Sequence, residues 1–265
     1  MSKAARLHDR ALIAATGEEA RPFLHRLLTQ EVETLGAGEL RFAALLSPQG
    51  RLLQELFLWG TEDGVLVDAP AADRDALLAK LRMFKLRAKV ELAGDDRPVQ
   101  ALWDAADSPP GWAADPRTPL AGLRGVGDAP ADADAGDYDA HRLALGLPDA
   151  ARDGLGDKAY ATEALLDLLN GVDYRKGCFV GQETTSRMKR RGGIRSRVLP
   201  LTVEGATGGA EVLNGTLRAG EVVATGAGRA LALLRLDRLQ GELTIDGRPA
   251  LVDRPAWWPD GEPPF

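Results

Sequence analysis

The sequence predicts an α+β protein that ends in a small β-barrel, and two patterns carry this prediction. Residues 6–58 show strand and helix periodicities in the order β-α-β-β. From Arg197 onward, short apolar stretches alternate with glycine-rich turns, which is typical of a small barrel. A chain of 265 residues, 45% of them hydrophobic, can bury a substantial core around such elements.

The opening β-α-β-β pattern follows from apolar spacing and from turn-forming residues. Apolar residues predict a strand over 6–16. Pro22 would remove a hydrogen bond deep inside a helix, so we expect the next helix to begin there. Two apolar strands are expected over 40–46 and 52–58, because Ser47-Pro48-Gln49-Gly50 between them is a good hairpin turn.

Further elements are expected between residues 65 and 137. A strand is predicted over 65–68, and a helix over 72–84, which places its large apolar residues on one face. Apolar and charged residues alternate over 86–92, which is the period of a half-buried strand. Residues 104–137 are rich in Ala, Pro, Gly and Asp and predict surface loops around a strand near 120–126.

Two helices are predicted in the second half of the chain, before the barrel. One covers 138–145, and the other runs from about Thr162, an N-cap residue, to the stop signal Asn170-Gly171. Strands of the barrel are expected over 198–203, 221–224, 230–236 and 243–245.

Charge is unevenly distributed along the chain. The net charge of −6 and the pI near 5.3 argue against a surface devoted to nucleic acid. Residues 127–139 contain five Asp and no Lys or Arg, whereas residues 175–197 contain eight basic residues and only Glu183 as an acid. A solvated face would explain the basic run, and this interpretation stays open. Its position beside Cys178 favours an anionic ligand.

The sequence predicts a cytoplasmic protein without membrane contact. Apolar runs such as Leu12-Ile13-Ala14-Ala15 are far shorter than a membrane span, and residues 1–6 lack a signal-peptide apolar region. Cys178 is the only cysteine, which excludes an internal disulfide and suits a reducing compartment.

Residues 176–183, Lys-Gly-Cys-Phe-Val-Gly-Gln-Glu, are the most informative segment for function. Glycines on both sides of Cys178 allow a sharp turn, and the cation of Lys176 favours the thiolate. Such a thiol could be a nucleophile, a redox sensor or a metal-sulfur contact. A small buried hydrophobe is the equally weighted alternative.

Most other site types are excluded by missing motifs. There is no phosphate-binding P-loop, GxGxxG, GxSxG or CxxC pattern, and His8, His25 and His141 lack metal-ligand spacing. No metal ligands are predicted. One thiol cannot hold an iron-sulfur cluster alone, so a cluster bound here would be shared or transient.

The residues that remain could bind a flat ligand beside Cys178. Gly177 and Gly181 would let the backbone approach such a ligand closely, while Gln182 and Glu183 follow directly. Neighbouring Arg and Lys would pair with carboxylates. A flat heterocycle with an acidic tail would suit this set.

The segment Asn170–Glu183, followed by Ser186-Arg187, resembles the signature of the YgfZ/GcvT-like folate-binding family. This family includes bacterial YgfZ proteins and their mitochondrial iron-sulfur maturation counterparts, and it is related to the glycine cleavage T-protein. Weaker similarity extends over nearly the whole chain. The similar blocks are 9–13, 16–20, 23–24, 45–51, 86–90 and 142–148.

The resemblance implies a three-domain ring with the aminomethyltransferase fold around a central folate channel. Residues 1–40 and 137–196 would form a discontinuous first folate-binding α+β domain, 41–136 a second α+β domain, and 197–265 the C-terminal β-barrel domain. Tetrahydrofolate or a derivative is the implied cofactor. The implied partners are folate and iron-sulfur client or assembly proteins, and nucleic acid is not expected.

The implied function is tetrahydrofolate-dependent assembly or repair of iron-sulfur clusters in client enzymes. The motif cysteine of the family matters for function, which gives Cys178 the catalytic role. The cofactor-binding residues implied by the same motif are Lys176, Gly177, Gly181, Gln182, Glu183 and Arg187.

Two other functions stay open. An aminomethyltransferase would need carboxylates at the folate, but the related enzyme's motif falls on Gly50–Glu55, where Gln54 replaces an Asp, and its pterin-contacting Glu falls near Ala144. An RNA-binding or tRNA-modification role could use residues 187–197, although this run lacks aromatic residues for base stacking. No classical enzymatic activity is predicted; a folate-dependent one-carbon transferase is the class expected of an enzyme here.

Overall fold

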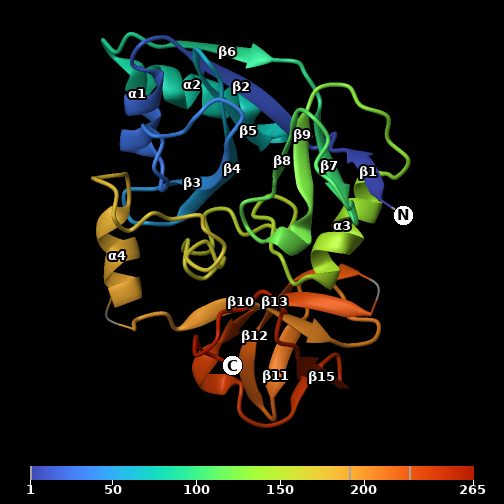
Figure 1. Cartoon of the computed structure of the whole chain (residues 1–265). Helices are drawn as coiled ribbons and strands as arrows, with labels where there is room; N and C mark the ends of the chain where they lie inside the picture. The colour runs from blue at the N-terminus through green and yellow to red at the C-terminus, as the bar shows by residue number, and fades with distance from the viewer. Residues whose placement is uncertain (1, 191, 227) are drawn as a thin grey trace.

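Two open sheets and one closed barrel make up the computed structural model, which describes residues 2–190, 192–226 and 228–265. Figure 1 shows the two sheets in the upper half, the barrel below them, and an irregular segment between the three. This mixed α/β architecture with a terminal barrel confirms the predicted fold class.

The larger open sheet is antiparallel and has the strand order β3-β4-β5-β2-β6. Its strands are β2 (Arg10–Thr16), β3 (Leu40–Leu46), β4 (Leu52–Gly60), β5 (Gly64–Pro70) and β6 (Glu91–Asp95). The predicted hairpin of β3 and β4 is confirmed. Every residue of β5 is buried, because this strand lies in the middle of the sheet and is covered on both faces.

Two amphipathic helices pack against this sheet. They are α1 (Ala20–Leu27), which begins two residues before Pro22, and α2 (Arg74–Lys85), preceded by the 3₁₀ turn η1 (Ala71–Asp73). Leu24 of α1 and Leu81 of α2 are buried with the branched residues of the sheet in one core. Both helices were predicted from their apolar spacing.

The strand predicted over 86–92 is wrong. Leu86 ends α2 with a φ of 47° and is 88% exposed, and the N–H of Ala88 bonds to the carbonyl of Lys85. Residues 86–90 therefore form a turn, and β6 begins at Glu91. The alternation of apolar and charged residues reflects the end of an amphipathic helix followed by this turn.

The smaller sheet has the order β1-β7-β9-β8 and is also antiparallel. Its strands are β1 (Lys3–Arg6), β7 (Val99–Trp103), β8 (Trp112–Ala114) and β9 (Leu123–Val126), with η2 (Pro119–Ala121) before β9. The strand predicted over 6–16 is thus two strands in different sheets. The Leu7 carbonyl, which accepts the N–H of Arg10, makes the turn between them.

The barrel closes with six strands in the order β10-β13-β12-β11-β14-β15. Its interior is filled by aliphatic side chains such as Leu199 and Leu234. The prediction of a small C-terminal barrel is confirmed, although β11 and β15 were not predicted. The strands are β10 (Ser196–Thr202), β11 (Glu211–Asn214), β12 (Leu217–Gly226), β13 (Arg229–Arg235), β14 (Leu243–Ile245) and β15 (Arg248–Val252), with η3 (Leu236–Arg238).

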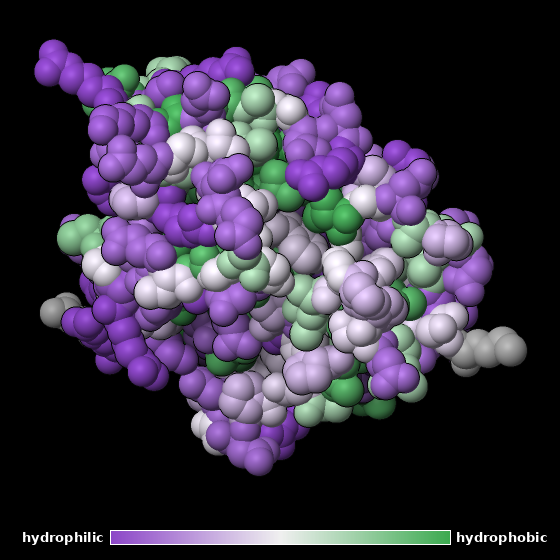
Figure 2. Space-filling view, turned by 45° about the horizontal axis from the view of Figure 1, so that its top comes forward, coloured by the Kyte–Doolittle hydropathy of each residue, from purple (hydrophilic) through white to green (hydrophobic). Residues whose placement is uncertain are grey.

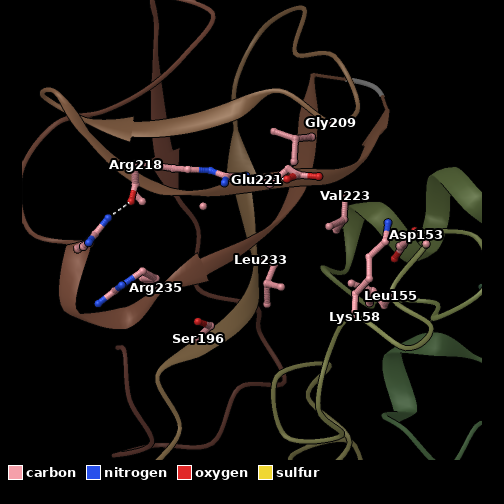
Figure 3. A pocket seen from close by; sticks show the side chains of 15 residues that line it. Asp153, Leu155, Lys158, Ser196, Gly209, Arg218, Glu221, Val223, Leu233 and Arg235 are labelled. Atoms are coloured by element: carbon pink, nitrogen blue, oxygen red, sulfur yellow. Dashed lines mark hydrogen bonds and ion pairs between the residues drawn. The ribbon is translucent and has the colours of Figure 1, made fainter. Parts of the chain in front are cut away.

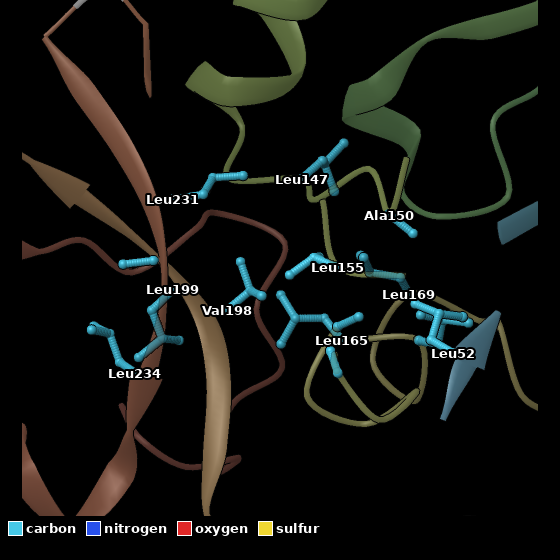
Figure 4. Packing of buried hydrophobic residues seen from close by; sticks show 14 of the residues in the cluster. Leu52, Leu147, Ala150, Leu155, Leu165, Leu169, Val198, Leu199, Leu231 and Leu234 are labelled. Carbon is cyan, nitrogen blue, oxygen red and sulfur yellow. The ribbon is translucent and has the colours of Figure 1, made fainter. Parts of the chain in front are cut away.

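The irregular segment 146–181 forms the core between the barrel and the larger sheet. In Figure 4, Leu155 and Leu165 lie between Val198 of the barrel and Leu52 of β4. The helix predicted over 162–170 is wrong, because its hydrogen bonds span three, four or five residues and Leu165 has a φ of 66°. Its leucines are buried from several sides, whereas a surface helix would bury only one face.

Two further helices flank this segment. α3 (Ala135–Ala144) begins with a capping box in which Asp134 and Asp137 accept each other's backbone N–H. α4 (Gln182–Arg190) was not predicted and follows the cysteine motif directly. Its many charged and polar residues gave no apolar stripe to detect.

A buried group of ion pairs joins the two open sheets. Asp68 of β5 accepts hydrogen bonds from Arg10 of β2 (2.7 Å) and from Arg124 of β9 (2.8 Å). The Arg124 guanidinium lies 3.7 Å from the centre of the Phe57 ring, and Arg117 lies 5.1 Å from it. The buried Asp68 carboxylate and the two guanidiniums that donate to it thus compensate one another, and buried charges need such pairing because burial without it is very unfavourable.

The predicted domain limits stay a prediction. Strands from two of the predicted units share the larger sheet, since β2 pairs with β5.

None of the helices in the described ranges has the length and apolar character that a membrane crossing needs. On the face shown in Figure 2, apolar residues form separate areas among hydrophilic ones.

We predict that Asp68→Ala lowers the free energy of unfolding by about 3–5 kcal/mol, because it leaves two buried guanidiniums without their carboxylate. Urea denaturation measures this change. Asp237→Ala removes an exposed pair with Arg235 and should leave the midpoint nearly unchanged. Equal effects of the two substitutions would contradict the role given to the buried pairs.

Candidate functional site

Cys178 is exposed on a short loop at the end of the irregular segment, directly before α4. Asp173 starts this loop, because its Oδ1 accepts the backbone N–H of Arg175 (2.7 Å) and of Lys176 (3.3 Å). The interpretation of Cys178 as a small buried hydrophobe is therefore wrong. Its thiol can be reached from solvent or by a partner protein.

Lys176 fixes the loop to the end of α1. Its Nζ donates to the Leu28 carbonyl oxygen at 2.7 Å and also to the His25 carbonyl oxygen. These oxygens belong to the C-terminal turn of α1, where a cation is favourable. Burial lowers the pKa of Lys176 to about 8, and the nearby Glu31 carboxylate opposes part of that decrease.

The two motif glycines do different things. A Cβ on Gly181, which has a φ of 81°, would come within 2.7 Å of the Ser47 carbonyl oxygen and 3.0 Å of Gly50 Cα. Gly181 therefore packs on the hairpin turn between β3 and β4. Gly177 is exposed, and a Cβ there would have His25 Nε2 as its nearest neighbour, at 3.9 Å.

The other motif residues lie on α4. A hollow of about 520 Å³ is lined by Gln182, Glu183, Ser186, Arg187 and Arg190. The predicted cofactor-binding residues thus divide between two places: Gln182, Glu183 and Arg187 line this hollow, while the ammonium of Lys176 is bound to carbonyl groups of α1.

The basic run is also divided. Arg197 is buried and pairs with Asp167 at 2.9 Å, and Lys189 bonds to Glu262 at 3.0 Å. Arg187, Arg190 and Arg195 are exposed, as is Arg175. Arg191 lies outside the described residues.

A second group of potential ligands lies beside the loop. His25 Nδ1 is 3.0 Å from Glu31 Oε1, and Oε1 also accepts the backbone N–H of Glu33 at 2.7 Å. One ligand atom from each of these three residues fits within 4.8 Å. The sequence did not reveal this group, because His25 lies inside α1 and the two acids lie in the loop after it. An acid-x-acid pattern shortly after a helix that contains a histidine is the only signal present.

A cavity of about 640 Å³ lies between the barrel and the irregular segment. Figure 3 shows Lys158 on one side of it and Arg218 and Arg235 on the other. Arg218 pairs with Glu221 at 2.7 Å, and Arg235 pairs with Asp237 at 2.7 Å. Cys178 does not line this cavity.

Two positions that matter for an aminomethyltransferase lie apart from the motif. Glu55 is only 2% exposed, and burial followed by the nearby Asp149 carboxylate raises its pKa to about 7. One carboxylate oxygen accepts the Ala150 N–H at 3.0 Å, and the other has no partner among the described residues. Ala144 is exposed near the end of α3.

Comparison with known proteins gives two kinds of similarity. The human iron-sulfur cluster assembly factor IBA57, mitochondrial, is 31% identical over 303 aligned residues, which cover 96% of this chain and 85% of that protein. An IBA57 homologue of Mycosarcoma maydis is 32% identical over 229 residues, or 76% of this chain and 57% of that protein.

This chain belongs to the family of IBA57-like iron-sulfur cluster assembly factors. Residues 195–260 match the model of the CAF17 C-terminal beta-barrel domain. The fold is also that of the glycine cleavage system aminomethyltransferase T from Bartonella henselae. Its crystal structure superposes with a TM-score of 0.77 at 17% identity, covering 95% of this chain and 84% of that one. The predicted YgfZ/GcvT-like family is confirmed.

The cytoplasmic location predicted for the chain is contradicted by this family. Relatives from human and from two fungi are named as mitochondrial proteins, which points to the mitochondrion instead. The prediction rested on one cysteine and a lack of long apolar runs. Both features suit any reducing compartment equally well.

We predict that Lys176→Met changes how stability depends on pH. The folded-state pKa of Lys176 is about 8 against an ordinary value of 10.5, so between these pH values the unfolded chain binds more protons. The free energy of unfolding of the parent should therefore rise with pH over this window relative to Lys176→Met, as measured by denaturation at several pH values. Lys80→Met, on the exposed face of α2, should follow the parent curve; parallel curves for parent and Lys176→Met would contradict the assignment.

Proposed function

We propose that this chain assists the assembly or repair of iron-sulfur clusters in client or assembly proteins, and that Cys178 is the group that contacts the cluster. Membership of the IBA57 family supports the process. The observation that carries the role of Cys178 is the exposed thiol on a loop that Lys176 fixes to α1.

A single thiol limits what the chain can do with a cluster. Iron-sulfur clusters are normally held by several thiolates, and Cys178 is the only cysteine of this chain. Most ligands must therefore come from a partner protein, which the exposed loop can meet. Binding of iron would release the thiol proton, because the thiolate is the ligand.

We propose no step that depends on tetrahydrofolate, because the residues predicted to bind it do not form one site. Lys176 is bound to backbone carbonyl groups, Gly181 packs on a hairpin turn, and Arg187 lies on α4. Between the two open sheets, the Phe57 ring is already stacked with guanidinium groups, and Glu55 is sealed from solvent.

The aminomethyltransferase and RNA-binding alternatives receive less support. The first needs a carboxylate that can reach a ligand, whereas Gln54 carries none and Glu55 is buried. The second would use Arg187, Arg190 and Arg195, which are exposed, but Lys189 and Arg197 of the same run are paired within the chain, and the run has no aromatic residue for base stacking.

We predict that Cys178→Ser abolishes function in cells that lack their own family member. The measurement is the activity of an iron-sulfur enzyme in those cells, which the parent chain should restore. Met83→Ser removes another exposed sulfur, on α2 and distant in sequence from Cys178. This control variant should restore the enzyme activity to the level that the parent chain gives. Full rescue by Cys178→Ser at equal protein level would remove the thiol from the mechanism.

We predict that calorimetric titration of the chain with tetrahydrofolate up to about 1 mM gives no saturable heat. A dissociation constant of about 1 mM corresponds to only about 4 kcal/mol of binding free energy, so this range would detect even weak binding. If saturable binding appears and is lost in Gln182→Ala with Arg187→Ala, the hollow on α4 is a folate site and our interpretation of these residues is wrong. A thermal unfolding curve of the double variant checks that α4 is intact.

A further inference from the structure

We propose that His25 and Cys178 together form a two-ligand metal site, with His25 Nε2 and Cys178 Sγ bound to the same metal centre. This inference rests on the proposed function, since it names a second residue that would hold the metal-sulfur cargo. It concerns a residue of α1 that lies 153 positions before the cysteine in the sequence.

The first observation is the position of the imidazole. His25 is only 9% exposed, and a Cβ on Gly177 would have Nε2 as its nearest neighbour at 3.9 Å. Among the described residues, no hydrogen-bond partner is found for Nε2. A histidine whose side chain is 11% exposed thus directs Nε2 at the residue next to Cys178.

The second observation is the contact on the other side of the ring. Nδ1 lies 3.0 Å from Glu31 Oε1, which places the ring proton on Nδ1 because the carboxylate can only accept. The Val32 N–H approaches the same nitrogen at the longer distance of 3.4 Å. A carboxylate on Nδ1 fixes the tautomer that leaves Nε2 free to bind metal, as in carboxylate-histidine-metal sites.

The third observation is the link between the two segments. Lys176 binds the backbone carbonyl of His25 itself, so the loop and the histidine are held together immediately before Gly177. Consecutive Cα atoms are about 3.8 Å apart, so Cys178 lies one residue beyond the position that the imidazole faces. A tetrahedral metal with these ligands needs N and S roughly 3.5 Å apart.

The chemistry of the pair suits an iron-sulfur partner. Imidazole and thiolate both bind iron, and histidine replaces cysteine at one iron of some two-iron clusters. A neutral imidazole adds no charge, and the ammonium of Lys176 lies beside the loop. Such a site favours an anionic, thiolate-ligated cluster whose remaining ligands belong to the partner.

A titration of the purified chain with Co²⁺ tests the site, because thiolate-to-cobalt charge-transfer absorption reports sulfur ligation. The parent should show this band, Cys178→Ser should lose it, and His25→Gln should weaken binding tenfold or more. Glu31→Gln should weaken binding about 10–100-fold while the band remains. His8→Gln, an exposed histidine after β1, is the matched control and should bind as the parent does.

Two more results decide between this site and its competitors. His25→Cys should restore Co²⁺ binding with a stronger thiolate band, which a purely structural role of His25 would not produce. Unchanged binding in His25→Gln would overturn the inference, and so would a loss of binding in Glu33→Gln equal to that in His25→Gln, since the metal would then lie among His25, Glu31 and Glu33. The metal site of His25 and Cys178 can be disproved in this way while Cys178→Ser still abolishes function in cells. Failure of the metal site and failure of the proposed function can therefore be distinguished.

Discussion

The ammonium group of Lys176 is the interaction on which the candidate site depends. It binds carbonyl oxygens at the end of α1, and so joins a loop from the second half of the chain to a helix from the first. Removing a buried lysine from water disfavours its charged form, which is why its pKa decreases. The motif lysine therefore acts through position: it holds Gly177 beside the His25 imidazole instead of facing a ligand itself.

The rest of the fold supplies a rigid support for this contact. Gly181 packs on the hairpin turn of β3 and β4, and the leucines of the irregular segment fill the space between the larger sheet and the barrel. The ion pairs of Asp68 close the junction of the two sheets. The likeness to an aminomethyltransferase is thus one of fold, and the exposed loop of Cys178 is where this chain offers chemistry to a partner.

Much of the fold could be predicted from the sequence, because β2–β5, α1–α3 and four strands of the barrel follow regular apolar periods. Strand β7 is buried at every position and has no alternation to detect. The segment 162–170 has helical spacing, but burial from several sides makes it irregular. At the site, the glycines around Cys178 left a reactive thiol and a small buried hydrophobe equally weighted, and the exposure of the loop excludes the second. The partners of Lys176 and the position of His25 could not be predicted, since contacts between residues about 150 positions apart leave no local pattern.

Diffraction from crystals of the chain soaked in Zn²⁺ tests the central claim most directly. Anomalous scattering locates the metal without reference to any activity. We expect one peak about 2.1 Å from His25 Nε2 and about 2.3 Å from Cys178 Sγ, the distances usual for nitrogen and sulfur ligands of zinc. A peak held by the Glu31 and Glu33 carboxylates without Cys178, or by Cys178 without His25, would contradict it.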